Sequence, residues 1–187
     1  MSKYQEIEAK LRVTSLEEVA QRLAQCGAKS VATRLQIDCY YDAEDRRLTE
    51  TDRCLRLRTE RTGQRDRLIL TYKGPKQADD FKKREEVNLM FSDVEAVERL
   101  VEGLGFRRML AFDKRRTIWE LEGCEVALDE LPLIGAFVEI EGPDAQCIAR
   151  VRETLDLGAA SHVTESYAAL VEEELTRRGL GEREVFL

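Results

Sequence analysis

The chain alternates hydrophobic and polar residues with a period of two in several separate stretches. Within residues 4–12, Ile7, Ala9 and Leu11 fall on one side, and charged residues fall on the other. Residues 82–90 alternate in the same way. This pattern is typical of a β-strand with one buried face. Further strands are predicted over residues 35–42, 53–60, 67–73, 112–120, 124–129 and 136–141.

Two helices interrupt the strands, and each begins with a capping signal. Ser15 and Glu18 form a capping box ahead of an amphipathic stretch, and Gly27 stands where a left-handed C-terminal cap is expected. The second helix carries the corresponding residues Ser92, Glu95 and Gly105. These signals predict one helix after the first strand and another after the strand at 82–90.

The order strand, helix, three strands occurs twice, as an internal repeat of about 80 residues. Two such halves can close on each other. Pro143 suits the first turn of a third helix, and a fourth helix is predicted to stop at Gly179. We therefore expect one domain over residues 1–179 and a frayed tail over 180–187.

Bulk composition limits the possible partners. The 187 residues carry a net charge of −7 and are 43% hydrophobic, which fits a globular protein without the basic surface that nucleic acid or an anionic membrane would need. No apolar run approaches the ~20 residues that cross a bilayer, and the start lacks the apolar core of a signal peptide. We expect a cytoplasmic protein whose basic chemistry is local.

The cysteines and the histidine do not indicate a covalent or metal-bound framework. The cysteines are odd in number, widely spaced and never arranged as Cys-x-x-Cys, so neither a disulfide framework nor a zinc site is predicted. We expect reduced thiols in the core or strands. His162 has no second His or Cys nearby, which favours a structural role. The cysteines are Cys26, Cys39, Cys54, Cys124 and Cys147.

The charged residues of the predicted strands separate by sign along the chain. The first strand and the last two carry the acidic residues Glu6, Glu8, Asp129, Glu139 and Glu141. The middle strands carry the basic residues Arg56, Arg58, Lys73, Arg84, Lys114 and Arg116. Only Lys10 and Glu86 break this segregation. The opposite faces are apolar, so helices can cover the outside while the charges point inward.

Two interpretations of this charged face stay open. In one, an open antiparallel sheet simply exposes its charged face to water. However, like charges opposite each other destabilise such a face, so segregation by sign favours an interior that binds a ligand. Arg and Lys contact phosphoryl oxygens, and carboxylates hold Mg²⁺ or Mn²⁺. The predicted ligand is therefore a small-molecule polyanion bound with metal ions.

The motif Glu6-Ile7-Glu8-Ala9-Lys10 resembles the Glu-x-Glu-x-Lys signature of the CYTH, or triphosphate tunnel metalloenzyme, superfamily. The later charged motifs follow in the family's order, and together they cover residues 6–141. They are the Leu-Arg-Leu-Arg of 55–58, the Lys-Gly of 73–74, the Arg-x-Glu of 84–86, the Lys-Arg-Arg of 114–116, Leu128-Asp129 and the Glu-x-Glu of 139–141. The segments Asp38-x-Tyr40-Tyr41-Asp42 and Ser166-Tyr167-x-x-Leu170 look most similar to the class IV adenylyl cyclase group.

The resemblance implies an α+β fold in which a closed eight-stranded antiparallel β-barrel, built from two β-α-β-β-β halves, has its helices packed outside. It implies a metal-dependent enzyme that converts ATP to cyclic AMP and pyrophosphate. Alternatives are an inorganic tripolyphosphatase, a thiamine triphosphatase or a non-catalytic polyphosphate-binding or nucleotide-binding module. A homodimer is compatible with the sequence, which does not determine the oligomeric state.

The resemblance also implies roles for the charged residues. Those implied to hold Mg²⁺ or Mn²⁺ are Glu6, Glu8, Asp129, Glu139 and Glu141. Those implied to bind the triphosphate are Arg56, Arg58, Lys73, Arg84, Lys114 and Arg116. Catalytic roles fall to Glu6, Glu8, Lys10 and Glu86, where Lys10 would fix a phosphate or orient Glu8. The motif assigns no role to Lys76, Lys82 and Lys83.

Overall fold

The computed structural model describes residues 5–63, 65–76, 82–181 and 183–187. Side chains are described for these residues apart from Gln5, Glu6, Arg65, Lys82 and Lys83. The chain forms strands and helices in the predicted order, with a few additional elements. The expected repeat of strand, helix and three strands is therefore confirmed.

The first half contains β1 (Gln5–Val13), α1 (Leu16–Gln25), β2 (Lys29–Asp42), the short α2 (Arg47–Glu50), β3 (Cys54–Thr62) and β4 (Arg65–Lys73). The second half contains β5 (Lys82–Phe91), α3 (Val94–Gly103), β6 (Arg107–Leu121), β7 (Cys124–Leu131) and β8 (Gly135–Glu141). Three elements follow: α4 (Ala145–Thr154), α5 (Tyr167–Arg177) and β9 (Glu184–Val185).

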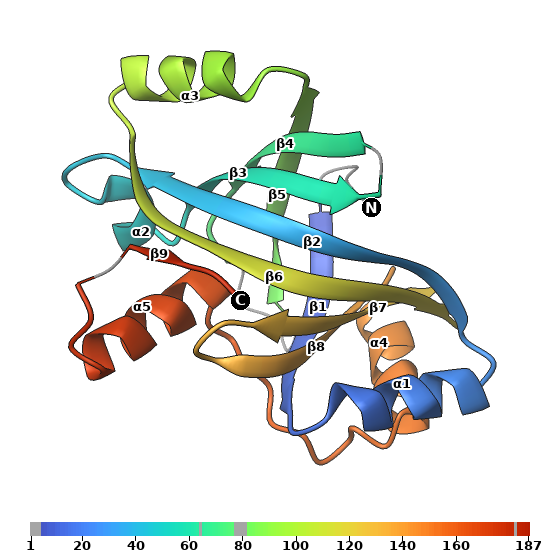
Figure 1. Cartoon of the computed structure of the whole chain (residues 1–187). Helices are drawn as coiled ribbons and strands as arrows, with labels where there is room; N and C mark the ends of the chain where they lie inside the picture. The colour runs from blue at the N-terminus through green and yellow to red at the C-terminus, as the bar shows by residue number, and fades with distance from the viewer. Residues whose placement is uncertain (1–4, 64, 77–81, 182) are drawn as a thin grey trace.

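The eight long strands form one antiparallel sheet that curls strongly, with the helices outside it (Figure 1). Their order is β2-β3-β4-β5-β1-β8-β7-β6, and β2 also pairs with β6. This last pairing runs from Lys29 opposite Glu120 to Asp42 opposite Arg107. It explains why β2 and β6 are longer than the predicted segments 35–42 and 112–120, since each extends along the other.

Helices α1, α3 and α4 cover the apolar outer face of the sheet. Around β1, β7 and β8 the core is formed by fully buried side chains such as Leu11, Val126 and Ile140, which pack with Leu23 of α1 and Ile148 of α4. Helix α3 covers the outer face of β2–β4 through a second cluster. Helix α5 instead packs at one end of the inner face, on a third cluster that includes Phe112 and Phe137. The two-residue period therefore turns the charged residues of the same strands toward the inner face.

Two of the three predicted helix starts are shifted by one or two residues. Ser15 caps α1 as expected, since its Oγ accepts from the Glu18 backbone N–H at 3.2 Å. The cap of α3 is Asp93 rather than Ser92, because Asp93 Oδ1 accepts from the Ala96 N–H at 3.1 Å. Pro143 was predicted in the first turn of α4, whereas Asp144 is the N-cap and Pro143 precedes it.

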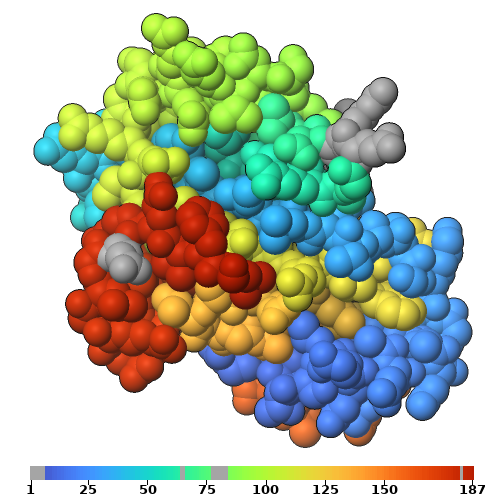
Figure 2. Space-filling view, in the orientation of Figure 1, coloured from blue at the N-terminus to red at the C-terminus, as the bar shows by residue number. Residues whose placement is uncertain are grey.

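The expectation of a frayed tail is wrong, because β9 pairs in parallel with Ala111 and Phe112 of β6. Strand β7 pairs with β6 only over Arg115–Leu121, which leaves the earlier part of that edge free for another strand. The Leu187 N–H also donates to Asp113 Oδ1 at 2.7 Å. Figure 2 shows the C-terminal segment on the surface beside β6. Within the described residues, no helix is long and apolar enough to cross a membrane.

Candidate active site

A cavity of about 440 Å³ lies on the charged inner face of the sheet, and every strand from β1 to β8 contributes side chains to it. Among the predicted site residues with described side chains, all but Asp129 line it. They are Glu8, Lys10, Arg56, Arg58, Lys73, Arg84, Glu86, Lys114, Arg116, Glu139 and Glu141. The side chain of Glu6 lies outside the described residues. The structure thus brings together charges that the sequence distributes over 134 positions, from residue 8 to residue 141.

Strand β3 carries Arg56 and Arg58 on the inner face, and both lie beside Asp38 of β2. Arg58 donates from Nε and Nη2 to the two Asp38 oxygens, each at 2.6 Å. The Nη1 atom of Arg56 lies 3.9 Å from Asp38 Oδ2. Burial opposes ionisation of Asp38, but the two guanidinium groups outweigh it and hold its pKa well below the usual value. Asp38 therefore fixes the orientation of Arg58.

The corresponding carboxylate on the other side of the cavity is Asp129 of β7, which is fully buried. It accepts from Lys114 Nζ at 3.1 Å, from Arg116 Nε at 2.7 Å and from the Tyr167 hydroxyl at 2.9 Å. Burial opposes ionisation of Asp129, while Arg116 and Lys114 lower its pKa. Its oxygens therefore already accept four hydrogen bonds from three side chains of β6 and α5, an environment different from that of an exposed metal ligand.

Lys114 is a buried cation in an unfavourable environment. Burial and the neighbouring Arg116 lower its pKa to about 7, against the attraction of Asp129. Its Nζ also lies 4.7 Å from the centre of the Tyr167 ring, and Lys10 Nζ lies 4.0 Å from the same ring centre. An incoming anion would relieve this repulsion and favour the charged form of Lys114.

Carboxylates from β1 and β8 gather on the remaining part of the wall. Glu8 lies directly opposite Glu141 in the strand register, and Lys10 lies opposite Glu139. Loss of water contacts and the nearby Glu8 and Glu125 raise the pKa of Glu141 to about 7. Like charges opposite each other are destabilising unless something neutralises them. This crowding is the environment that a divalent cation would relieve.

Ion pairs orient several of the cavity side chains. Lys73 Nζ contacts a Glu86 oxygen, Arg116 contacts Glu139, and Lys10 Nζ lies 3.5 Å from Glu139 Oε1. Lys10 Nζ also donates to the Glu165 carbonyl at 3.0 Å.

Three arginines that line the cavity retain hydrogen-bonding capacity. The Nε atoms of Arg34, Arg56 and Arg84 are buried, and none has a hydrogen-bond partner among the described residues. Buried N–H donors without a partner are costly, so an anionic ligand that reached these atoms would stabilise the site.

No metal site is preassembled in the described part of the chain, where no cluster of three or more Asp, Glu, His or Cys side chains is close enough to hold an ion. The chemistry of the donors nevertheless fits Mg²⁺ or Mn²⁺, which prefer carboxylate oxygens. Glu8, Glu139 and Glu141 supply such oxygens. His162 lies elsewhere, where its Nε2 is 3.0 Å from Arg152 Nη1, so its expected structural role agrees with its position.

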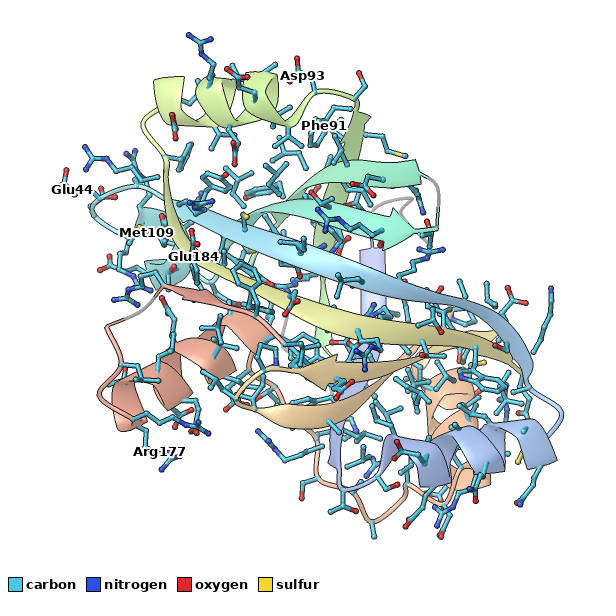
Figure 3. All side chains as sticks on the ribbon, in the orientation of Figure 1. Glu44, Phe91, Asp93, Met109, Arg177 and Glu184 are labelled. Atoms are coloured by element: carbon cyan, nitrogen blue, oxygen red, sulfur yellow. The ribbon has the colours of Figure 1, made fainter. Side chains whose placement is uncertain are left out.

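One end of the cavity is formed by segments that the sequence analysis did not assign. The loop around α2 contributes Thr49 and Asp52, and the start of α5 also lines this end. Met109 of β6 also lines the cavity and is labelled in Figure 3 close to Glu184 of β9. Asp42 holds the loop by accepting from the Leu48 and Thr49 N–H groups at 3.0 and 2.9 Å. This end also carries the aromatic residue Tyr40 and the apolar residue Leu110, which are paired in the β2–β6 register.

Lys76, to which the motif assigned no role, connects two segments at this end. Its Nζ lies 3.3 Å from Asp52 Oδ1 in the loop after α2 and donates to the Thr164 carbonyl at 3.4 Å. Lys76 therefore links the chain after β4 to the segment before α5. The side chains of Lys82 and Lys83 lie outside the described residues.

Asp38, Asp42 and Tyr167 are the residues whose importance the sequence did not indicate. Each occurs in a segment that suggested the adenylyl cyclase group, but no charge pattern indicated what each contacts. Direct cross-strand pairing could have found Asp38, which lies opposite Arg58 in the β2–β3 register. The contact of Tyr167 with Asp129 joins α5 to β7, and no local pattern predicts it.

Known proteins are similar to this chain over most of its length. A protein of Methanocaldococcus jannaschii, provisionally named adenylate cyclase MJ0240, is 32% identical over 136 residues, which are 73% of this chain and 75% of that protein. The solved structure of the PH1819 protein from Pyrococcus horikoshii is 27% identical and has a TM-score of 0.80, covering 90% of this chain and all but 1% of the other.

A more distant structure shows the same fold in a protein with a reported activity. HpAC1 from Hippeastrum, reported to have a dominant triphosphatase activity, is 18% identical with a TM-score of 0.69, covering 94% of this chain and 96% of its own. The CYTH domain family matches residues 4–167 of the present chain. This match extends from β1 to the first residue of α5 and includes every strand that lines the cavity, so the chain belongs to the CYTH domain family.

Proposed function

We propose that this chain is a divalent-metal-dependent enzyme that converts ATP to cyclic AMP and pyrophosphate. The observation that carries the proposal is the convergence of basic side chains from β3, β4, β5 and β6 on one cavity that also receives carboxylates from β1 and β8. A polyphosphate and a hard cation together neutralise both sets of charges. The β2–β6 pairing supports a closed tunnel around this ligand.

The proposed triphosphate-binding residues are the six predicted cations. Arg58 is oriented by Asp38, and Arg116 and Lys114 are oriented by Asp129. The buried Nε atoms of Arg56 and Arg84 are further donors for phosphoryl oxygens. Positioned cations of this kind supply most of what phosphoryl transfer asks of a protein, namely alignment and charge stabilisation. The six are Arg56, Arg58, Lys73, Arg84, Lys114 and Arg116.

We propose Glu8, Glu139 and Glu141 as metal ligands, together with Glu6, which belongs to the same strand as Glu8. A bound Mg²⁺ or Mn²⁺ would neutralise the charge that develops on the phosphoryl oxygens. For Asp129 we propose a positioning role in place of the metal-binding role that the resemblance implied, because its oxygens already accept from three side chains. Glu86 would position Lys73, and Lys10 would position Glu139.

The reaction favoured by this cavity is intramolecular. In the cyclase reaction the ribose 3′-hydroxyl forms a bond to the α-phosphorus, and the bond to the β-phosphate oxygen breaks to release pyrophosphate. A volume of about 440 Å³ falls within the range of sites that hold drug-sized ligands. Tyr40 and Leu110 line one end of the cavity, where a nucleoside would be accommodated. This feature favours ATP over inorganic tripolyphosphate.

The phosphate-binding residues alone would equally serve a hydrolase, in which water attacks the terminal phosphorus. The test is to incubate the protein with ATP, thiamine triphosphate or tripolyphosphate, each with Mg²⁺ or Mn²⁺, and to identify the products. Cyclic AMP and pyrophosphate from ATP would support the proposal. Inorganic phosphate from any substrate without cyclic AMP would replace it with a triphosphatase, and binding without any product would indicate a binding module.

A matched pair of variants links the activity to the cavity. Glu139→Gln keeps the shape of the side chain but removes the charge that a hard cation needs, so turnover should fall at least 100-fold while the fold persists. Glu130→Gln, on the exposed rim of β7 where it pairs with Arg115, should leave turnover unchanged. Equal activity in both variants would exclude this cavity as the active site.

A further inference from the structure

The side chains of two cysteines from different elements contact each other in the core between the outer face of the sheet and α4. Cys124 begins β7, and Cys147 lies in the first turn of α4. Their Sγ atoms are 3.0 Å apart, which is about 1 Å more than the length of a disulfide bond. Both side chains are buried in the cluster that joins β1, β7 and β8 to α1 and α4. Neither residue lines the cavity.

The surrounding structure holds both sulfur atoms in place. The Asp144 carboxylate accepts from the Cys147 backbone N–H at 2.8 Å and fixes the first turn of α4. The Cys147 thiol lies 3.2 Å from the Glu122 carbonyl in the turn before β7. On the other side, a Cβ atom at Gly142 would come within 2.8 Å of Cys124 Sγ, so the glycine leaves the space that this sulfur occupies.

We propose that Cys124 and Cys147 form a disulfide bond that fastens α4 to the start of β7. The small adjustment needed is a rotation of the two side chains, because their sulfur atoms already lie in contact. The remaining cysteines are Cys26, which is exposed, and Cys39 and Cys54, which lie on β2 and β3.

The bond forms by exchange with a small-molecule disulfide such as oxidised glutathione. One cysteine thiolate attacks the oxidant, releases one glutathione thiolate and leaves a mixed disulfide. The second cysteine thiolate attacks this intermediate and releases the second glutathione. The two protein thiols thereby lose two protons and two electrons, and the oxidant becomes two molecules of reduced glutathione.

Burial controls how fast this exchange occurs. Burial, with the hydrogen bond that Cys124 donates to Cys147, raises the pKa of Cys124 to about 12, so the folded protein contains little Cys124 thiolate at neutral pH. Oxidation is therefore expected during folding, before α4 covers the sulfur atoms. Once formed, the bond should resist reduction for the same reason.

The test is to refold the full chain from denaturant in a buffer of oxidised and reduced glutathione, to block the free thiols, and to measure the intact mass and the linked peptides. The proposal predicts loss of two of the five thiols and one dominant linked peptide pair, Cys124 with Cys147. Five free thiols under this condition, or a dominant link between other cysteines, would overturn it.

Thermal unfolding provides a second measurement that does not depend on peptide recovery. The bond closes a loop over residues 125–146. For a loop of about 20 residues, the oxidised protein should have a Tm higher than that of the reduced protein by on the order of 10 °C. Cys147→Ala can destabilise the core by itself, so the quantity compared is the difference between oxidised and reduced forms of each variant. This difference should disappear in Cys147→Ala and persist in Cys26→Ala. A rise that persists in Cys147→Ala would contradict the assignment.

Discussion

Lys114 should take up a proton when a triphosphate binds. Its pKa in the ligand-free protein is about 7, because it is buried beside Arg116. At pH 8 only about 0.1 of the Lys114 side chains are then protonated, while a bound polyanion should return the pKa toward the ordinary value near 10.4 and the charge to nearly one. The expected uptake is therefore about 0.9 proton per ligand bound.

The assay is isothermal titration calorimetry of ATP binding at pH 8 in two buffers whose ionisation enthalpies differ. The difference in apparent binding enthalpy gives the number of protons exchanged. The terminal phosphate of ATP, with a pKa near 6, is already ionised at this pH and contributes little. The titration buffer contains Ca²⁺ in place of Mg²⁺, in order to slow turnover of ATP during the measurement.

Two variants isolate the contribution of Lys114. Lys114→Met removes the titrating group and should reduce the uptake to nearly zero, although it also weakens binding. Lys29→Met removes a solvent-exposed lysine paired with Glu120 and should leave the uptake at the wild-type value. Less than about 0.2 proton in the wild type, or an equal uptake in Lys114→Met, would refute the assignment of the low pKa to this residue.

Three further predictions follow from other contacts. Arg58→Ala should lower the free energy of unfolding by about 3 kcal/mol, because it removes the bidentate partner of the buried Asp38, and tripolyphosphate should then raise Tm less than in the wild type. Addition of Mg²⁺ at pH 6.5 should release about 0.8 proton from Glu141, because its pKa is about 7 and the metal displaces the proton. At pH 8.5 Glu141 is already ionised, so almost no proton should be released. If calorimetry shows the same proton release at both pH values, Glu141 is not a metal ligand. Asp93→Ala should lower the free energy of unfolding, measured in urea, by about 1 kcal/mol, because it removes the N-cap of α3. Ser92→Ala should change this free energy little. The reverse order would show that the cap is misassigned.

Local patterns predicted most of the strands because the alternation of side chains in a strand depends only on the backbone geometry of neighbouring residues. Glu8 and Lys10 therefore share a face wherever β1 packs. The same rule placed Arg56 with Arg58 and Glu139 with Glu141, and all of these side chains line the cavity. The helix caps were less certain, because Ser92 and Asp93 are both good caps and the choice depends on where the backbone becomes helical.

Contacts between segments that are distant in sequence required the folded structure. The sequence showed Asp129 as one more carboxylate, but its oxygens face two cations from β6 and a hydroxyl from α5, which changes its proposed role. Likewise, Cys124 and Cys147 showed no spacing typical of a disulfide and yet lie in contact. The β2–β6 pairing and the β9 strand depend on which edges the other strands leave uncovered.

The sequence by itself thus determined which side chains face inward and the charge of each part of the chain, since both follow from residue type and a two-residue period. The tertiary structure alone decided which charges neutralise each other and which buried N–H groups still need a partner. The physical reason is that Coulomb energy and hydrogen bonding depend on distances of a few ångströms and on burial. Those distances, such as that between Arg58 and Asp38, are set only when the strands pair.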